Sequence, residues 1–583
     1  MCGIFALLND SNFISKQSDF IQKQFAKGRN RGPEFSKLVS GGINLTLGFH
    51  RLAINGINDK SNQPITIGNV TLICNGEIYN YKELYSLMNV TPETDSDCEI
   101  IIHLYMKYGI EHTLQMLDGV FAFVLCDNTN VLKGGINVSS NKVYVARDPY
   151  GVRPLYVVKH KLSSIRVVGF ASELKCVSEF QSIDNGYTID HFQPGTYSFY
   201  ELPPRAVAYW NCIKENVSYH STGFNSIIVS RVVPCEIGAC LGIKNFLMQA
   251  VEKRCSTTER PIACLLSGGL DSSIVTALVN EFRQQLMPGC TPLETYSIGL
   301  ADSEDLKHAK IVADYLGTKH TEIVLTEQDF LDAIPEVIYA IESYDTTSVR
   351  ASIGNYLLGK YISKNSEAKV IFNGDGSDEL CGGYLYMHKC PDAIEFDRES
   401  RRLLKDIHAF DVLRSDKCIA SHGLEPRTPF LDRSWVQYYL SIDPRIRYHP
   451  GNKDQCEKYL LRMAFSDKFF RNMEGKPLLP DSILWRRKEA FSDGVSKTSR
   501  SLYEIIEEYV NSLPESNVSS SGVNALTKEQ KYYKSIFEKH YPNALNIVPY
   551  YWMPKYVNAT DASARTLDLY NDPAGTEKKA LAQ

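Results

Sequence analysis

The chain has 583 residues, a formal net charge of −5 at pH 7 and a hydrophobic content of 43%. This length exceeds a single typical core, so we expect two or more domains in a globular protein. The slightly negative charge argues against nucleic-acid partners and provides no attraction to acidic membrane surfaces. No apolar stretch approaches the ~18 residues that span a bilayer, so we expect no membrane segment.

Cysteine spacing indicates the redox compartment. The fifteen cysteines are scattered, and none forms a C-x-x-C pair. A disulfide framework or a zinc site is therefore not expected, and reduced thiols in the cytoplasm are the default interpretation. The N-terminal stretch IFALL is too short for the apolar core of a signal peptide, and no basic residue precedes it.

Residues 2–210 are predicted to form a first domain that is rich in β-strands. The stretches TLGFHRLAI, VTLICNGEIYN, GVFAFVLCD and KVYVARD alternate or run apolar over strand-like lengths. Between strands, DPYG at 148–151 is typical of a turn, and KGGINVSSN at 133–141 is typical of a hairpin loop.

One helix is predicted in this domain, over residues 96–109. Ser96 is its expected N-cap, Glu99 stands at the capping-box position, and Gly109 follows its expected end. The loop-like segment 211–235 is assigned as a linker.

Residues 236–560 are predicted to form a second domain of a different kind. PIACLLS is a continuous apolar run, as in a strand buried on both faces, and LETYSIGL, HTEIVLT and AKVIFNG are further strands. Helices lie between them, such as DLKHAKIVADYLG, which Gly317 closes. Strands that alternate with helices predict a parallel α/β sheet. Residues 390–540 are mainly helical in pattern.

Two stretches near the C-terminus are expected to lack regular structure. ESNVSSSG at 515–522 is predicted to be a flexible loop, and 561–583 a polar tail that is disordered beyond about residue 570.

The sequence SGGLDSS stands between the first strand of this domain and a helix. On composition it could be a simple Gly-Ser turn. Glycines, however, let backbone N–H groups approach an anion, and serines and the helix N-terminus add donors. Asp271 would repel phosphate unless a cation intervened, so Mg²⁺ is implied. The stretch resembles the pyrophosphate loop of enzymes that cleave ATP between its α- and β-phosphates, and its residues are Ser267, Gly268, Gly269, Asp271 and Ser272.

A second polar cluster, FNGDGSDELCGGY, follows another apolar strand. Asp378 and Glu379 suit the first turn of a helix, which is a purely structural explanation. That explanation leaves the glycine spacing unaccounted for. We therefore interpret Asn373, Gly374, Asp375 and Asp378 as a Mg²⁺-phosphate or acid/base site.

Cys2 follows the initiator methionine and has two remaining interpretations, a core cysteine or a nucleophile. An N-terminal nucleophile carries its own base, because the α-amine has a reference pKa of ~7.7–8.0. Such a site also needs oxyanion donors and groups that hold a zwitterion. Each candidate alone has a mundane structural interpretation, but together they would form such a pocket: Arg51, Asn75, Gly76, Glu77 and Asp97.

Long stretches of the chain resemble one known family. MCGI, RGPE, HRLAI, NGEIYN, SDCE, LDGVFAF and ARDPYGVRPLY are similar to class II glutamine amidotransferase domains. SGGLDSS, IESYDTTSVRAS, FNGDGSDELCGGYLYMHK, EPRTPFLD, EKYLLR and RRKEAFSDGV resemble the synthetase domain of glutamine-hydrolysing asparagine synthetases. The resemblance implies an N-terminal αββα sandwich of the N-terminal-nucleophile hydrolase class. It also implies a C-terminal parallel α/β domain of the ATP pyrophosphatase (PP-loop) class, with additional helices.

The resemblance implies a role for each residue of the first domain. Cys2 would attack the carboxamide of L-glutamine to give a thioester and ammonia, with Asn75 and Gly76 holding the oxyanion. Arg51 would bind the glutamine carboxylate, and Glu77 and Asp97 its ammonium. The backbone that lines the pocket would be that of Leu52, Ala53, Ile54 and Asn55.

For the second domain the resemblance implies that L-aspartate reacts with MgATP to form β-aspartyl-AMP. Ammonia, which would arrive through an internal tunnel, would then convert this intermediate to asparagine. Leu266 and Ile298 would lie near the adenosine, and Asp271 and Asp378 would hold Mg²⁺ and pyrophosphate. The phosphates and intermediate would also contact Thr347, Arg350 and Lys458. A homodimer is implied by the family resemblance only.

One position departs from the family pattern, and two other activities stay open. Many members have Glu where this chain has Asp375, which is one methylene shorter, so the catalytic role of that carboxylate is less directly implied. A related enzyme could amidate another carboxylate. A catalytically silent sensor of glutamine or nucleotide is the alternative from a different class.

Overall fold

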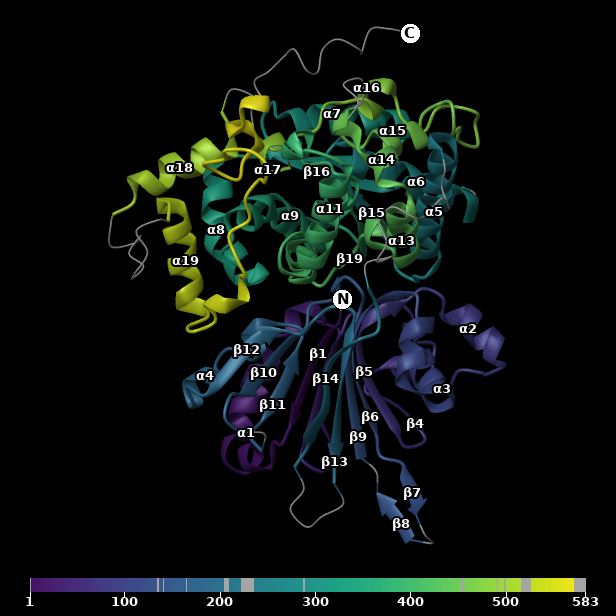
Figure 1. Ribbon diagram of the computed structural model, residues 1–583, viewed down its shortest axis with the longest axis vertical. Coiled ribbons are helices and arrows are strands. Elements are labelled where there is room, and N and C mark those ends of the chain that lie inside the picture. The colour runs from purple at the N-terminus through teal and green to yellow at the C-terminus, as the bar shows by residue number, and fades with distance from the viewer. Residues whose placement is uncertain are drawn as a thin grey trace. The chain divides into compact units, whose positions relative to one another are not determined.

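A computed structural model describes residues 2–133, 136–139, 141–163, 165–203, 209–221, 235–286, 289–451, 456–489, 491–496, 500–514 and 526–570 (Figure 1). The chain divides into two compact units. The first comprises Met1–Ser221 with Ala420–Glu425 and Glu538–Ile547, and the second comprises Thr222–Ile419 with Pro426–Phe537 and Val548–Gln583. Across the described parts of the chain, no helix is both long enough and apolar enough to cross a membrane.

The first unit is built on two six-stranded antiparallel sheets. In spatial order, one sheet contains β12 (Tyr187–His191), β10 (Tyr156–His160), β11 (Val168–Ala171), β1 (Gly3–Leu8), β3 (Leu45–Arg51) and β2 (Phe35–Gly42). The other contains β14 (Asn211–Ser218), β13 (Thr196–Leu202), β9 (Asn141–Arg147), β6 (Gly119–Asp127), β5 (Val70–Ile78) and β4 (Ile65–Ile67).

Alternation along the strands gives each sheet two buried faces. In β5, Ile73 belongs to the core between the sheets, whereas Leu72 and Cys74 pack with α2 (Tyr81–Met88) and α3 (Ile100–Met116). In β1, Ile4 belongs to the core between the sheets, and Phe5 contacts Phe25 of α1 (Ser11–Ala26) with ring centroids 6.0 Å apart. Short α4 (Phe180–Ile183) lies on the same side as α1 (Figure 1). These layers confirm the αββα sandwich.

Two later segments of the chain complete the first unit. Asn546 donates its side-chain N–H to the carbonyl of Ile189 at 2.8 Å, and Gln181 donates to the carbonyl of Asn543 at 3.3 Å. From the other segment, Glu425 lies 3.7 Å from Arg153, and both side chains are almost fully buried. The first unit therefore includes residues that are distant from it in sequence.

The predicted strands of this unit correspond to β3, β5, β6 and β9, and the DPYG turn is closed by a 3.2 Å bond from the Gly151 N–H to the Asp148 carbonyl. The segment expected to be a hairpin loop itself contains strand structure. β7 (Asn130–Lys133) pairs with β8 (Ile136–Ser139), so KGGINVSSN includes part of a two-stranded ribbon.

The helix predicted over 96–109 differs from expectation at its start. Ser96 caps a short 3-10 turn, Asp97–Glu99, and α3 then continues to Met116. Glu99 accepts from the backbone N–H groups of Glu93 and Thr94 instead of completing a capping box. Gly109 has non-helical geometry, at φ +76° and ψ 171°, so the first helical stretch ends there as predicted, and a second stretch continues α3 to Met116.

The second unit contains a five-stranded sheet. Its order is β17 (Lys319–Leu325), β16 (Glu294–Leu300), β15 (Ile262–Leu265), β18 (Val370–Phe372) and β19 (Glu425–Arg427), and the first four are parallel. Flanking helices are α5 (Glu236–Ser256), α6 (Leu270–Leu286), α7 (Glu304–Leu316), α8 (Glu327–Ile341) and α9 (Thr346–Asn365). Gly317 caps α7 in the left-handed conformation, as predicted. The parallel α/β class is confirmed.

The later part of this unit is mainly helical, as predicted. Its helices are α10 (Ser377–Cys381), α11 (Ala393–Asp406), α12 (Asp411–Ala420), α13 (Arg433–Ser441), α14 (Pro444–Arg447), α15 (Tyr459–Ala464), α16 (Asp481–Leu484), α17 (Phe491–Gly494), α18 (Leu502–Ser512) and α19 (Lys528–His540). The predictions for ESNVSSSG and for the tail beyond residue 570 lie outside the described residues.

A fully buried ion pair joins two helices of the second unit. Glu342 follows the end of α8, and its carboxylate lies 2.5 Å from the ammonium of Lys417 in α12. Neither side chain has solvent exposure. Each charge is desolvated, so each depends on the other for its compensation.

Replacing Lys417 with Met is expected to leave the Glu342 carboxylate buried without its counter-ion. We predict that Lys417→Met lowers the free energy of unfolding of the second unit by about 3–5 kcal/mol. Urea denaturation followed by circular dichroism measures this change. The double variant Lys417→Met/Glu342→Gln should recover part of the loss, and a single variant as stable as wild type would contradict the prediction.

Candidate functional site

Cys2 stands immediately before β1 in the first unit. Its thiol donates to the carbonyl of Leu52 at 3.6 Å, and its own carbonyl accepts from Nε of Arg31 at 2.9 Å. Burial raises the pKa of the Cys2 thiol. A thiol in this environment reacts efficiently only when a base accepts its proton.

Arg51 ends β3 and organises the residues that follow it. Its guanidinium donates to the carbonyl of Asn58 at 2.8 Å, to the side chain of Asn62 at 2.7 Å and to the carbonyl of Asn55 at 3.3 Å. It also donates to the Gly56 carbonyl. Arg51 therefore holds the loop that contains the expected pocket backbone, Leu52, Ala53, Ile54 and Asn55.

The end of β5 brings the other expected glutamine-binding residues to the same region. Asn55 donates to the Glu77 carboxylate at 2.7 Å, and Asp97 accepts from the backbone N–H of Ile78 at 2.7 Å. A Cβ on Gly76 would lie 2.5 Å from the carbonyl oxygen of Val120, so the strand pair admits only glycine there. The residues that sequence alone singled out thus come from two neighbouring stretches, the loop after β3 and the end of β5.

Asn75 is fully buried, and its side chain retains unused bonding capacity. Its Nδ2 donates to Ser172 Oγ across 3.4 Å, a long bond, and Oδ1 has no hydrogen-bond partner among the described residues. The same hydroxyl accepts from the backbone N–H of Ile4 at 3.1 Å. Ser172 therefore links β1, which follows Cys2, to β5. Sequence reasoning did not identify Ser172, which belongs to no quoted motif, and it gave no role to Arg31, although Arg31 begins the RGPE motif.

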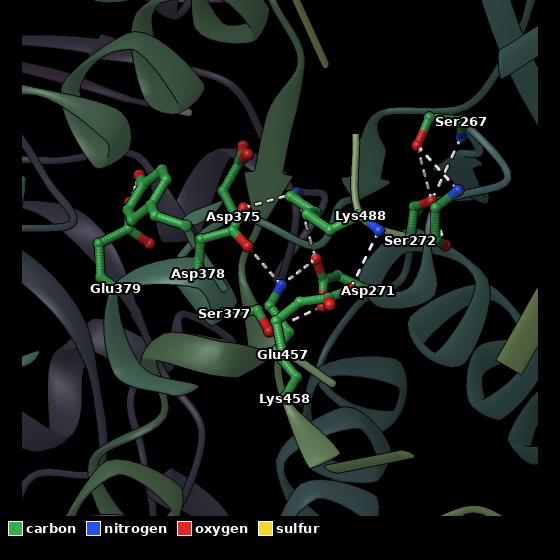
Figure 2. Close-up of polar contacts among 12 residues, drawn as sticks. Ser267, Asp271, Ser272, Asp375, Ser377, Asp378, Glu379, Glu457, Lys458 and Lys488 are labelled. Atoms are coloured by element: carbon green, nitrogen blue, oxygen red, sulfur yellow. Dashed lines mark hydrogen bonds and ion pairs between the residues drawn. The ribbon is translucent and has the colours of Figure 1, made fainter. Parts of the chain in front are cut away.

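In the second unit, the SGGLDSS loop connects β15 to α6. The hydroxyls of Ser267 and Ser272 are 3.0 Å apart, and Ser267 Oγ accepts from the N–H of Gly269 at 3.3 Å. Gly268 has φ +69°, and a Cβ there would lie 2.4 Å from the backbone of His308 and Ala309. The loop is therefore a tight turn that keeps its hydroxyl and amide groups beside the start of α6 (Figure 2).

The acidic loop connects β18 to α10 and touches the first loop. Ser377 donates its hydroxyl to Asp271 at 2.8 Å, and a Cβ on Gly374 would lie 2.8 Å from both the Asp271 Cβ and the Ser272 backbone nitrogen. Asn373 donates to Ser415 at 2.8 Å. The two polar motifs, separated by about a hundred residues in sequence, therefore form one site at the carboxyl ends of adjacent parallel strands.

Two lysines neutralise the two carboxylates of this site. Nζ of Lys458 lies 2.6 Å from Asp271 Oδ2 and 2.5 Å from Asp378 Oδ1, and Nζ of Lys488 lies 2.8 Å from Asp378 Oδ2. Figure 2 shows both ammonium groups directed at the carboxylates. Burial alone would raise the pKa of Asp378, but the charges of Lys458 and Lys488 outweigh it and hold that pKa below its usual value.

The arrangement fits a magnesium ion that arrives with a nucleotide. Asp271 and Asp378 already converge on one cationic position, which the Lys458 ammonium takes. No group of three or more metal-binding side chains occurs in the described part of the chain. Mg²⁺ in phosphate-transfer sites is bound by one or two carboxylates together with substrate phosphates, and Asp271 and Asp378 are a pair that could serve in this way.

Asp375 has a cationic neighbour that the sequence did not reveal. Nη2 of Arg414, in α12, lies 3.3 Å from Asp375 Oδ1 and 2.6 Å from Asp411 Oδ1. Asp375 Oδ2 and Arg414 Nη1 are buried without a hydrogen-bond partner among the described residues. The pair thus offers one acceptor and one donor to a ligand in the cavity, whose walls include both residues.

One cavity gathers most of the residues expected in this domain. Those that line it are Leu266, Ser267, Gly269, Asp271, Ser272, Ile298, Thr347, Asn373, Gly374, Asp375, Asp378 and Lys458. Its lining does not include Gly268, which shapes the turn, or Arg350. Arg350 is buried elsewhere against Glu529, at 2.9 Å, and Asp561, at 2.6 Å. Arg414 lines the cavity although it belongs to no quoted motif, and Lys488 lines it as part of the RRKEAFSDGV stretch, for which the resemblance implied no residue-level role.

The close approach at Gly374 generates a prediction about the cavity. A methyl group there would push the acidic loop away from backbone atoms that cannot yield, so Gly374→Ala should weaken MgATP binding about 10-fold, measured by calorimetry. Gly475→Ala is the control for backbone strain alone, because its φ of +76° disfavours alanine although the added Cβ meets nothing within 4 Å and the residue lies outside the cavity lining. Equal affinities for the two variants would contradict the assignment of the cavity.

Comparisons with known proteins cover both units. A model of the asparagine synthase family matches residues 242–395 and 391–553, and a model of the glutamine amidotransferase domain matches residues 1–216. The chain is 40% identical to "Asparagine synthetase [glutamine-hydrolyzing]" of Cricetulus griseus over 98% of its own length and 100% of that protein. The proteins of the same name from Homo sapiens and Gallus gallus are each 40% identical over 98% of this chain and 99% of theirs.

Proposed function

The chain belongs to the family of glutamine-hydrolysing asparagine synthetases, and from this premise we propose how its residues carry out the reaction. The enzyme makes L-asparagine from L-aspartate with glutamine as nitrogen donor and ATP as energy source. Glutamine, aspartate, ATP and water give glutamate, asparagine, AMP and pyrophosphate. The observation that carries the residue-level proposal is the convergence of Asp271 and Asp378, from two separate motifs, on one cationic position in the cavity.

In the first unit, Cys2 is the nucleophile. Once Met1 is removed, the free α-amine accepts the thiol proton, and the sulfur attacks the side-chain carbonyl carbon of glutamine. The carbon–nitrogen bond then breaks and releases ammonia, and water hydrolyses the thioester to glutamate. Donors from Asn75 and Gly76 hold the oxyanion, and Asn75 is supported in this role by its burial and its long bond to Ser172.

Removing the thiol should separate the two half-reactions. We predict that Cys2→Ala abolishes asparagine synthesis from glutamine but keeps synthesis from added ammonium chloride, because the second unit does not use the thiol. Asparagine and AMP are measured with each nitrogen source. If the folded variant also failed to make asparagine from ammonia, the proposal that the two units catalyse separate half-reactions would be wrong.

In the second unit, the β-carboxylate of aspartate attacks the α-phosphorus of ATP, pyrophosphate leaves, and β-aspartyl-AMP forms. Ammonia then attacks the acyl carbon and AMP leaves. Leu266 and Ile298 lie against the adenosine, while the SGGLDSS loop, Lys458 and Thr347 hold the phosphates and the intermediate. Asp271 and Asp378 would hold Mg²⁺, which supplies charge neutralisation for the leaving pyrophosphate when it is bound.

Asp375 performs the acid/base work of the ammonia step. Its carboxylate lines the cavity and is held by Arg414 at 3.3 Å. Deprotonating the attacking nitrogen requires a fixed acceptor near the acyl carbon, and the unpartnered Oδ2 supports Asp375 in that role. Arg414 thereby compensates for the shorter side chain by fixing it in place.

Neutralising this carboxylate should slow synthesis with either nitrogen source. Asp375→Asn is expected to lower the rate of asparagine formation about 100-fold with glutamine and with ammonia, while glutamine hydrolysis stays within about twofold of wild type. Rates are measured across a panel of carboxylic acids. If pyrophosphate release by the wild-type enzyme did not depend on aspartate, aspartate would not be the substrate that is amidated. A rate of asparagine synthesis by Asp375→Asn within twofold of wild type would exclude Asp375 from the chemistry.

We further propose that the enzyme works in the cytoplasm as a homodimer. All fifteen cysteines are free thiols, which a reducing compartment would maintain. The dimer rests on the family resemblance alone, and sedimentation velocity would test it.

A further inference from the structure

The last described stretch of the chain, residues 561–570, contacts two walls of the synthetase cavity, and we call it the C-terminal strap. Its polar composition predicted only a tail. In the structure it makes a short 3-10 turn, Ala564–Thr566, which Ser563 caps. Two of its charged side chains, Asp561 and Arg565, are mostly buried in ion pairs with other parts of the second unit.

The first wall that the strap contacts is the segment 486–489. All four of its residues line the cavity, and the segment forms neither helix nor strand. The Glu489 carboxylate accepts from Nε and Nη2 of Arg565, at 3.2 and 2.6 Å, and from the Tyr570 hydroxyl at 3.0 Å. Arg487 donates to the Tyr570 carbonyl at 2.8 Å. A segment without its own backbone ladder depends on such anchors for a single conformation.

The strap holds the chain again just beyond this segment, in α17. Ser563 donates its hydroxyl to the side chain of Asp493 at 3.1 Å, and Arg565 donates to the Asp493 carbonyl at 3.0 Å. Asp493 is almost fully buried. One guanidinium, that of Arg565, therefore binds the cavity wall both at Glu489 and four residues further along.

The second wall is α9, whose Thr347 and Ala351 line the cavity. Arg350 lies between them in sequence but has its guanidinium outside the cavity lining. Asp561 accepts from both of its terminal nitrogens, at 2.6 and 3.0 Å, in the bidentate geometry that fixes an arginine most firmly. Because Arg350 and Thr347 are one helical turn apart, a fixed Arg350 also fixes how α9 presents Thr347 to the cavity.

Arg565 has an electrostatic effect on the cavity as well. The Glu489 side chain is 15% exposed and lines the same cavity as the SGGLDSS loop. A carboxylate there would repel the phosphates of a nucleotide at short range. The Arg565 guanidinium, at 2.6 Å, compensates this charge from a position outside the cavity lining.

We propose that the C-terminal strap is a positioning element of the synthetase site, in which Arg565 acts through Glu489 and Asp561 acts through Arg350. The two cavity walls are thereby held in the arrangement that binds MgATP. The inference rests on the proposed function of this cavity. Neither Arg565 nor Asp561 lines the cavity, so both act through other residues and neither contacts the substrates.

Removing the charge of Arg565 tests the first contact. In Arg565→Met, the KM for MgATP in asparagine synthesis from ammonia should rise about 10-fold, because charge-assisted hydrogen bonds to Glu489 are lost. Arg565→Lys, which keeps a cation, should regain part of the loss. Adding Glu489→Gln to Arg565→Met should cause little further loss, because the effect passes through Glu489. Glutamine hydrolysis by the first unit should stay within about twofold of wild type.

Two further measurements separate positioning from general stability. Hydrogen exchange followed by mass spectrometry should be faster across residues 486–489 in Arg565→Met than in wild type. Asp561→Asn keeps the shape of its side chain and should lower kcat/KM for MgATP about 5-fold through Arg350. The control is Arg402→Met, which removes an ion pair of 2.7 Å in the same unit outside the cavity lining and should change neither quantity.

A purely structural strap would give a different pattern. Arg565→Met and Asp561→Asn would then lower the midpoint of thermal unfolding, while the folded enzyme kept the wild-type KM for MgATP and the wild-type exchange across 486–489. That result would overturn the inference and leave the proposed function intact. If Arg565→Met did not fold, the kinetics of Arg565→Lys and Asp561→Asn would decide in the same way. Failure of the wild-type enzyme to make asparagine from aspartate, ammonia and MgATP would instead overturn the proposed function, and the inference with it.

Discussion

The synthetase cavity depends on charge balance among four side chains. Asp271 and Asp378 are partly buried, with side chains 13% and 22% exposed, beside the ammonium groups of Lys458 and Lys488, and these residues come from four separate segments of the second unit. Each charge is stable there only because the opposite charge is close. The side chains are closely packed, since a Cβ on Gly383 would lie 2.0 Å from both Asp378 Oδ1 and Lys458 Cε. The distance between the two polar loops is therefore set by electrostatics as much as by the sheet below them.

The first unit positions its site by another means. Its polar groups are held mainly by backbone atoms, as when Arg51 donates to carbonyls of the loop after β3 and Asp97 accepts from the N–H of Ile78. Behind them stands an apolar core between two sheets. Such a site keeps its shape whether or not a charged ligand is present, because few of its supports are themselves ion pairs. A rigid site of this kind suits the proposed hydrolysis of glutamine. A site whose charges are balanced suits the proposed release of pyrophosphate.

Sequence predicted best where the signal is local. The period-two strands of the sandwich, the apolar run of β15 with its loop, and the Gly317 cap are each determined by a few neighbouring residues. The end of the first helical stretch at Gly109 belongs to the same group, because a glycine at positive φ breaks helical geometry by itself.

Long-range partners were beyond sequence reasoning. Arg414 is 39 residues from Asp375, and Lys488 is 110 residues from Asp378, so no spacing rule connects them. Arg350 has partners that the sequence did not indicate. The resemblance implies contact with the intermediate, but its guanidinium is shared by Glu529 and by Asp561, which lies in a stretch that its polar composition marked only as a tail. Composition cannot show that a polar residue such as Asp561 pairs with a buried residue of opposite charge such as Arg350.

The segments Ala420–Glu425 and Glu538–Ile547, which complete the first unit, have a consequence for the order of folding. The ribosome makes the sandwich strands first, but Asn546 and Asn543, the partners of Ile189 in β12 and Gln181 in α4, follow only when almost the whole chain has been made. Likewise, Glu425 is synthesised more than 250 residues after Arg153, so the ion pair between them cannot form until then. The nucleophile domain is thus the first to begin folding and cannot finish before its partner has been synthesised. A polypeptide cut at the apparent domain boundary would lack part of its own first domain.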